Sequence, residues 1–253
     1  MPPRTVLLTG GSSGIGQALA HEFARRGTHV ALAARRLGTL ETIRDRIVKD
    51  GGKCTVYALD VSDVEAASEC VRKADRDLGR LDMVIANAGI GGSGKGTPVA
   101  WESVDEVFRT NVAGCLATLV AATHVFMHHQ GGHLVAVTSL AGRRGLPGVA
   151  AYSASKAAVS TFLESTRIDL ASTGIHVTDV QPGFVDTPIN QEMGSARPFL
   201  WQPPKAARVI VDRLERKPAV IAFPWQLDVA TRFARILPAW MWARVAPGRT
   251  PRP

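Results

Sequence analysis

A glycine-rich turn separates the first apolar run of this chain from its first helical pattern. Thr5–Thr9 reads TVLLT and is followed by GGSSGIG, which runs into a helix predicted over Gly16–Arg26. Glycine permits a tight turn and a close approach of backbone to ligand, and the N–H groups that open a helix suit a pyrophosphate. At this place in a strand–helix–strand unit, the loop predicts dinucleotide binding rather than an ordinary turn. The residues that we assign to this cradle are Gly10, Ser12, Ser13, Gly14, Ile15 and Gly16.

Short apolar runs alternate with amphipathic segments along the rest of the chain. Several runs are nearly continuous in apolar residues rather than alternating, which is typical of strands buried on both faces of a parallel sheet. The predicted strands are Thr5–Thr9, His29–Ala33, Thr55–Leu59, Met83–Ala86, His133–Thr138, His176–Val180 and Ala219–Ala222. The predicted helices are Gly16–Arg26, Thr39–Lys49, Asp63–Leu78, Val104–His128, Ser153–Ala171 and Pro204–Arg216. We expect an α/β fold with a doubly wound parallel sheet of the Rossmann type, in three layers and a single domain over residues 1–253.

The composition is that of a globular protein. The chain has 253 residues, of which 45% are hydrophobic and 21% charged, which excludes disordered, collagen-like and disulfide-scaffold chains. Its three cysteines, Cys54, Cys70 and Cys115, are widely spaced without a CxxC pair, which favours a reducing compartment. The N-terminus lacks the pattern of a signal peptide, and no run approaches the ~18 apolar residues of a membrane span. We therefore expect a cytoplasmic protein.

The net charge of +8 is concentrated in the last fifth of the chain. Residues 1–200 are almost neutral, whereas residues 201–253 hold ten basic and three acidic side chains. A basic chain raises nucleic acid or an anionic membrane as partners. Nothing but charge suggests nucleic acid, so we predict no nucleic-acid partner, whereas membrane contact by the C-terminal segment stays an alternative. The excess of positive charge therefore belongs to the C-terminal segment, residues 201–253.

An arginine pair ends the second predicted strand. A carboxylate at this place would bind the ribose hydroxyl of NAD, whereas this chain has Ala34-Arg35-Arg36. Guanidinium groups pair well with a phosphate. The pair therefore favours NADP(H) over NAD(H), with a solvated surface pair as the alternative.

A tyrosine and a lysine stand four residues apart in the predicted helix after the fifth strand. Tyr152 and Lys156 share one helix face. The ordinary tyrosine pKa of about 10 is too high for acid–base work at neutral pH, and a neighbouring ammonium lowers it. Ser139, at the end of the fifth strand, is placed to hydrogen-bond a substrate oxygen. A surface Tyr–Lys pair is the alternative.

These motifs together resemble those of the short-chain dehydrogenase/reductase family, single-domain type of about 250 residues, from Thr5 to Ala222. Thr9–Gly16 is similar to the family's TGxxxGxG loop, and Asp60-Val61 to a pair that contacts adenine. Asn87-Ala88-Gly89 matches a motif beside the cofactor. Pro182-Gly183-Phe184-Val185-Asp186-Thr187 matches a segment beside the nicotinamide. The catalytic set that the resemblance implies is Asn111, Ser139, Tyr152 and Lys156. The cofactor set that it completes is Asp60, Val61, Asn87, Ala88, Gly89, Tyr152, Lys156, Pro182, Gly183, Val185 and Thr187.

The resemblance implies an oxidoreductase that transfers a hydride between NADP(H) and a small-molecule carbonyl or alcohol, with ketone or aldehyde reduction as the expected direction. Tyr152 would exchange the proton, Ser139 would polarise the substrate oxygen, and Lys156 would lower the Tyr152 pKa and bind the nicotinamide ribose. Asn111 would link Lys156 to solvent through water. A homodimer or homotetramer is implied as well. The alternative is a non-catalytic NADP-binding regulatory protein on the same fold.

Two basic clusters lie outside these motifs. His124, His128 and His129 end a predicted helix without an accompanying carboxylate, so we expect no metal site and attribute them to the helix C-terminus. Arg143 and Arg144 follow Ser139 and would either attract an acidic substrate or form a solvated surface pair.

The last two segments border the expected substrate site. Residues 188–202 match the place of a substrate lid and include Ile189, Met193 and Trp201, which favour an apolar substrate or simple packing. Residues 223–253 form a C-terminal extension rich in tryptophan and arginine, in which Pro238 is expected to end or kink a helix. The extension covers the cleft, forms an oligomer contact, or lies on a membrane.

Overall fold

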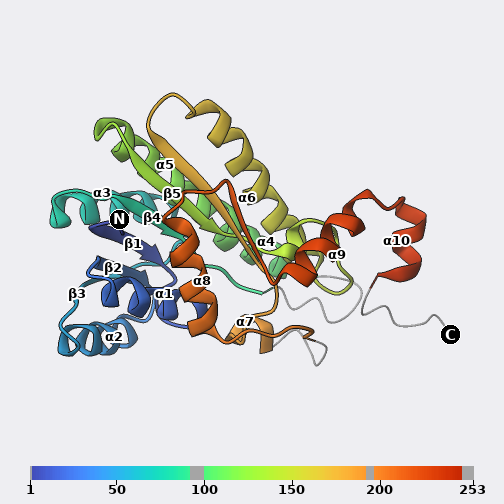
Figure 1. The fold of residues 1–253 in the computed structure, drawn as a ribbon, viewed down its shortest axis with the longest axis horizontal. Coiled ribbons are helices and arrows are strands. Elements are labelled where there is room, and N and C mark those ends of the chain that lie inside the picture. The colour runs from blue at the N-terminus through green and yellow to red at the C-terminus, as the bar shows by residue number, and fades with distance from the viewer. Residues whose placement is uncertain (1, 92–99, 192–196, 247–253) are drawn as a thin grey trace.

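Seven parallel strands form the centre of the computed structural model, which describes residues 2–91, 100–191 and 197–246. Their order is β3-β2-β1-β4-β5-β6-β7, as Figure 1 shows. The strands are β1 Thr5–Thr9, β2 His29–Ala34, β3 Lys53–Ala58, β4 Met83–Ala86, β5 Gly132–Val137, β6 Ile175–Pro182 and β7 Val220–Phe223. All seven predicted strands therefore exist, and the doubly wound parallel sheet is confirmed.

Helices cover both faces of the sheet because successive strand residues point to opposite faces. In β1, Val6 and Leu8 belong to one core and Leu7 to the other. The first core includes residues of α1 (Gly14–Arg25), α2 (Leu37–Lys49) and α8 (Pro203–Leu214). The second includes residues of α3 (Val64–Leu78), α5 (Cys115–His128) and α6 (Ala150–Asp169). These are the expected three layers.

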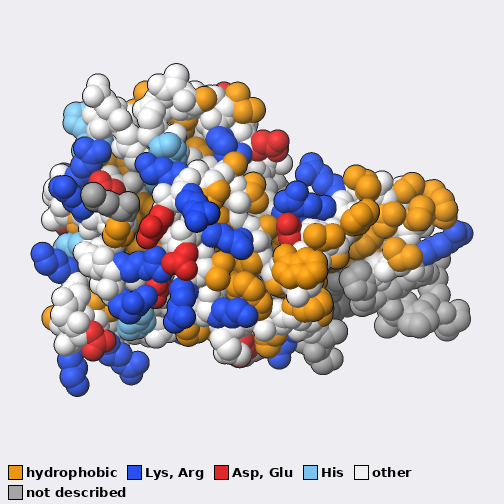
Figure 2. Space-filling model, in the orientation of Figure 1, with side chains coloured by type: hydrophobic (Ala, Val, Ile, Leu, Met, Phe, Trp, Pro, Cys, Tyr) orange, Lys and Arg blue, Asp and Glu red, His pale blue; other side chains and the backbone are white. Residues whose placement is uncertain are grey.

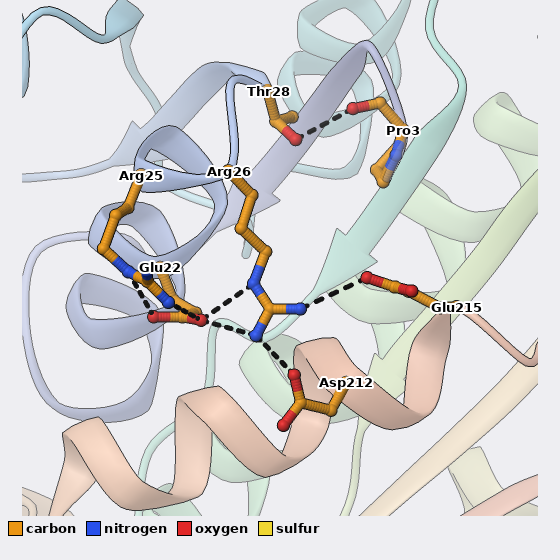
Figure 3. Close-up of polar contacts among 7 residues, drawn as sticks. All are labelled: Pro3, Glu22, Arg25, Arg26, Thr28, Asp212 and Glu215. Atoms are coloured by element: carbon orange, nitrogen blue, oxygen red, sulfur yellow. Dashed lines mark hydrogen bonds and ion pairs between the residues drawn. The ribbon is translucent and has the colours of Figure 1, made fainter. Parts of the chain in front are cut away.

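Charged side chains join α1 to α8 on the first face. The Arg26 guanidinium is 17% exposed and contacts three carboxylates. It donates to Glu22 Oε1 at 2.6 Å within α1, and to Asp212 and Glu215 on the α8 side (Figure 3). The two helices are therefore held by an ion-pair network as well as by their apolar faces.

The predicted helix over Val104–His128 begins earlier and is interrupted. It consists of α4 (Trp101–Phe108), a π-helical turn over Arg109–Gly114, and α5. By length and composition Trp101–His128 is apolar enough to cross a membrane, so the expectation that no segment reaches this threshold was wrong. Here the segment packs in the fold, with α5 against α3 and β5 and α4 against α6.

The C-terminal extension forms two further helices. These are α9 (Trp225–Ile236) and α10 (Ala239–Val245), and Pro238 separates them, as the proline rule predicts. Both lie beyond the carboxyl ends of β5 and β6, to one side of the sheet (Figure 1). A short helix, α7 (Pro188–Gln191), precedes α8.

Candidate active site

A cavity of about 790 Å³ lies at the carboxyl ends of the central strands. The strand order reverses between β1 and β4, and ligands of open α/β sheets bind at such a point. Predicted site residues in its wall are Gly10, Ser13, Gly14, Ile15, Gly16, Asn87, Ala88, Gly89, Ser139, Tyr152, Lys156, Pro182, Gly183 and Thr187. The tertiary structure thus brings together residues that are up to 177 positions apart in the sequence.

The glycine-rich loop is packed tightly against the segment after β4. Gly10 has φ +69°, and a Cβ atom on Gly16 would lie 2.2 Å from the Gly10 carbonyl oxygen. Asn87 Nδ2 donates to Thr9 O at 3.0 Å and to Gly10 O at 3.2 Å. The Ser13 side chain makes no capping bond to α1, whose first turn opens into the cavity. This cradle fits the pyrophosphate of a dinucleotide.

The residues predicted for the adenosine end lie outside the cavity wall. Arg36 Nη2 donates to Ser12 Oγ at 3.0 Å, and Arg35 Nη1 lies 4.0 Å from Asp60 Oδ2. Hydrogen bonds from the backbone and hydroxyl of Ser62 lower the pKa of Asp60. Two exposed guanidinium groups therefore flank the end of β2, beside the phosphate loop.

Two hydrophobic members of the predicted cofactor set are buried in the protein rather than exposed to the cavity. Val61 is 6% exposed and belongs to the second core. Val185 is 1% exposed, belongs to the first core, and pairs with Trp201 in an isolated bridge. Their side chains serve packing.

The predicted catalytic side chains meet at one wall of the cavity. Ser139 follows β5, and its Oγ accepts from Ala141 N at 3.1 Å. Tyr152 and Lys156 lie on α6, and the Lys156 Nζ is 5.7 Å from the centre of the Tyr152 ring. Lys156 Nζ also donates to Val137 O at 3.0 Å. All three residues are buried, at 9%, 9% and 6% exposed in sequence order.

Burial decides the pKa values of this group. It raises the pKa of Tyr152, and the hydrogen bond with Ser139 opposes that rise without cancelling it. Burial lowers the pKa of Lys156. The expectation that Lys156 lowers the Tyr152 pKa therefore needs correction for the protein without cofactor. The apolar surroundings disfavour the phenolate, and Lys156 is not among the groups that shift the Tyr152 pKa.

Asn111 lies in the π-helical turn and is 1% exposed. Its Oδ1 accepts from Ile90 N at 2.8 Å, while its Nδ2 donates to Ile90 O at 3.0 Å and to Ser155 Oγ at 3.1 Å. Ser155 Oγ in turn donates to Tyr152 O at 2.7 Å. Asn111 thus connects the segment after β4 with the helix that carries Tyr152, just behind the cavity wall.

The C-terminal extension supplies wall residues that the sequence motifs do not indicate. Leu227, Ala230, Thr231 and Ala234 of α9 and Trp242 of α10 line the cavity. Arg143 and Arg144 contact this extension, so they form neither of the two expected arrangements, a solvated pair or an anion site. The one sequence feature that pointed to a role for these two arginines near the cavity was their position shortly after Ser139.

Some residues of the expected lid, residues 188–202, line the cavity, and others pack in the core. Ile189, Asn190 and Pro198 line the cavity, whereas Trp201 stacks on Phe223 with 4.9 Å between ring centres and belongs to the packing. Met193 lies outside the described residues.

The histidine cluster has a carboxylate partner that the sequence did not reveal. His129 Nε2 lies 2.9 Å from Asp75 Oδ1 on α3. Within the described ranges, no group of three or more His, Cys, Asp or Glu side chains is placed to hold a metal ion.

Comparison with known proteins decides the family. Residues 4–198 match the family model of short chain dehydrogenases. The chain belongs to this family. It is 45% identical over 238 residues to an uncharacterized oxidoreductase of Myxococcus xanthus, with 94% of each chain covered. It is 34% identical over 224 residues to an uncharacterized oxidoreductase of Mycobacterium tuberculosis, with 87% of this chain and 88% of that one covered.

Solved structures of other short-chain dehydrogenases share this architecture. An alcohol dehydrogenase from Thermococcus sibiricus, complexed with 5-hydroxy-NADP, has a TM-score of 0.78 and 26% identity, covering 87% of this chain and 94% of that one. A variant of actinorhodin polyketide ketoreductase with NADPH has a TM-score of 0.81 and 25% identity, covering 88% and 97%. This short-chain dehydrogenase is therefore an oxidoreductase whose fold binds a nicotinamide cofactor.

Proposed function

We propose that this short-chain dehydrogenase reduces a ketone or aldehyde with apolar substituents, using NADPH. The observation that carries the proposal is the buried Tyr152 phenol, which shares one cavity wall with Ser139 and Lys156. Because burial raises its pKa, the phenol is protonated at neutral pH. A protonated phenol is the form that reduction of a carbonyl requires. The same constellation disfavours a non-catalytic regulatory protein.

Each side chain has a defined part in this reaction. Tyr152 donates its proton to the carbonyl oxygen, while Ser139 holds that oxygen by a hydrogen bond. When bound, the nicotinamide supplies the hydride for the carbonyl carbon. Lys156 holds the nicotinamide ribose, and Asn111 connects Lys156 to solvent through water. The loop Gly10–Gly16, Asn87–Gly89 and the segment Pro182–Thr187 hold the rest of the cofactor.

Tyr152→Phe tests the proposal, because it removes the proton donor and little else. We expect turnover of a panel of ketones and aldehydes with NADPH to fall by about 10²- to 10⁴-fold, with NADPH binding largely intact. Tyr57 is the other tyrosine of the chain and bonds to Asp77 on α3, so Tyr57→Phe is the matched control. Near-normal turnover by Tyr152→Phe contradicts the assignment.

The preference for NADPH over NADH is supported by Arg35 and Arg36. Both side chains are exposed beside the loop that carries Ser12, where a phosphate on the adenosine ribose pairs with guanidinium groups. We expect Arg35→Asp to reverse the preference in a fluorescence titration with the two cofactors. Retained preference for NADPH would show that Arg35 does not bind the phosphate.

The proposed assembly is a homodimer or homotetramer in the cytoplasm. Supporting it, the outward side of the C-terminal extension exposes large apolar side chains, among them Trp225 (71%), Phe233 (64%) and Trp240 (61%). Figure 2 shows hydrophobic atoms over much of the α9–α10 projection. Light scattering of Phe233→Ser against wild type tests whether this surface joins subunits, and co-sedimentation with anionic vesicles tests the membrane alternative.

A further inference from the structure

The Arg143 guanidinium joins the sheet to the C-terminal extension. Its side chain is 11% exposed. Nε donates to Gln181 Oε1 on β6 at 2.7 Å. Nη1 donates to Asp228 Oδ1 at 2.6 Å, to Asp228 O at 3.1 Å and to Thr231 Oγ1 at 3.1 Å. One side chain therefore fixes the first turns of α9 relative to the strand that ends at the cavity.

The sheet side of this contact is itself held by buried hydrogen bonds. Gln181 Nε2 donates to Asp179 Oδ2 at 2.6 Å, and Thr138 Oγ1 donates to Asp179 Oδ1 at 2.5 Å. Asp179 is 3% exposed and Gln181 is 8% exposed. Because a buried carboxylate is costly unless it is hydrogen-bonded, this network fixes Gln181, and Gln181 fixes Arg143.

Arg144 holds the opposite end of α9. Its guanidinium donates to Arg235 O at 3.3 Å and to Leu237 O at 3.1 Å, and lies 5.9 Å from the centre of the Trp242 ring. Trp242 Nε1 donates to Gly145 O at 2.9 Å. The loop Arg143–Gly145 thus contacts the start of α9, its end and α10.

Without the arginine contacts, apolar packing would hold the C-terminal extension only weakly. Within the described chain, Ala234 is the one buried residue of α9, and α10 has none. One side of α9 lines the cavity through Leu227, Ala230, Thr231 and Ala234. The opposite side, with Trp225, Val229, Phe233 and Ile236, is exposed. The position of this cavity wall therefore depends on the arginine contacts more than on a hydrophobic core.

We propose that Arg143 and Arg144 are positioning residues that hold α9 and α10 as the outer wall of the substrate cavity, and so determine which carbonyl substrates fit. The proposal rests on the proposed function and names the part of the chain that selects the substrate. Small side chains at Ala230 and Ala234 leave room for a bulky apolar group, whereas the reacting oxygen is held by Ser139 and Tyr152.

Arg143→Met removes the contact and keeps most of the side-chain length. We expect the KM for a bulky ketone such as acetonaphthone to rise about tenfold, because a displacement of about 1 Å in a positioning wall can cost up to about 10²-fold. The KM for butanone and the dissociation constant of NADPH stay within about twofold of wild type. Hydrogen exchange of the amides of Trp225–Ile236 becomes faster in the protein without ligand.

Two further variants make the test specific. Asp228→Asn keeps the shape of the contact partner and weakens the same bond, so it gives the same pattern in milder form if Arg143→Met folds poorly. Arg26→Met is the matched control, because Arg26 forms a comparable ion-pair network between α1 and α8 (Figure 3) and does not line the cavity. It lowers stability without changing the ratio of the two KM values or the exchange of α9.

Failure of this proposal is separate from failure of the proposed function. Unchanged exchange of α9 in Arg143→Met overturns the proposal whatever the activity, because that measurement requires no substrate. An unchanged ratio of KM values for the two ketones overturns it in an active enzyme. By contrast, full activity of Tyr152→Phe overturns the proposed reaction and leaves the exchange result standing.

Discussion

His133 is expected to make folding stability fall in mild acid. It lies on β5, is 3% exposed, and its Nε2 is 2.8 Å from Thr178 Oγ1. Thr178 Oγ1 donates its own hydrogen to Pro218 O at 2.5 Å, so it accepts from His133 Nε2–H. That leaves Nδ1 unprotonated, buried and without a hydrogen-bond partner among the described residues. A proton on Nδ1 would have neither solvent nor an acceptor.

These surroundings lower the pKa of His133 from 6.5 to about 3. Burial is the main cause, and the nearby His176 and Lys217 add to it. The unfolded chain takes up a proton below pH 6.5, whereas the folded protein takes it up only near pH 3, so stability decreases as the pH falls between these values. At 1.36 kcal/mol for each pKa unit, the loss is about 2.7 kcal/mol at pH 4.5 and about 4.4 kcal/mol at pH 3, where half of the folded protein carries the proton.

Urea unfolding of wild type and His133→Leu at pH 7.5 and pH 4.5 measures this contribution. At a fixed protein concentration, the free energy of unfolding of the variant should decrease between the two pH values by about 2.7 kcal/mol less than that of wild type. Other histidines with lowered pKa values, among them His21 and His29, contribute equally to both proteins and cancel. Equal decreases in wild type and variant would refute the assignment of a buried neutral His133.

Three further predictions concern the cavity and the helices around it. Gly16→Ala should abolish NADPH binding in a fluorescence titration, because its Cβ would lie 2.2 Å from the Gly10 carbonyl oxygen. The rate of carbonyl reduction should not decrease as the pH rises through neutrality, because burial raises the pKa of Tyr152 and the protonated phenol is the active form; stopped-flow measurement with NADPH checks this. Arg26→Met should reduce the free energy of unfolding by about 1–2 kcal/mol, measured by urea denaturation, because three ion pairs are lost and a largely exposed pair is worth about 0.2–1 kcal/mol.

The sequence predicted the strands and the core of the site because their signals are local. A run such as TVLLT is apolar in its interior, and it became a strand between the two cores, as that pattern requires. Tyr152 and Lys156 lie on one helix, and their spacing alone placed them on the same face. The phosphate loop was predictable for the same reason, since it lies between one strand and the next helix.

Contacts between distant residues had no such signal. Arg143 and Asp228 are separated by 85 positions, and no periodicity links them. Asp179 was predicted to lie in an ordinary strand, His176–Val180, although a carboxylate within an apolar run is a sign of a buried polar network. The π-helical turn at Asn111 was also missed, because helical periodicity does not reveal a local change of pitch.

The sequence by itself determined the reaction class, the succession of strands and helices along the chain, and the residues placed at the carboxyl ends of the strands. The tertiary structure alone decided the direction in which the Tyr152 pKa shifts, the outer wall of the cavity and the contacts of the arginines after Ser139. The physical reason is that pKa values and ion pairs depend on burial and on which groups meet in space. Neither quantity is encoded in the spacing of residues along one element.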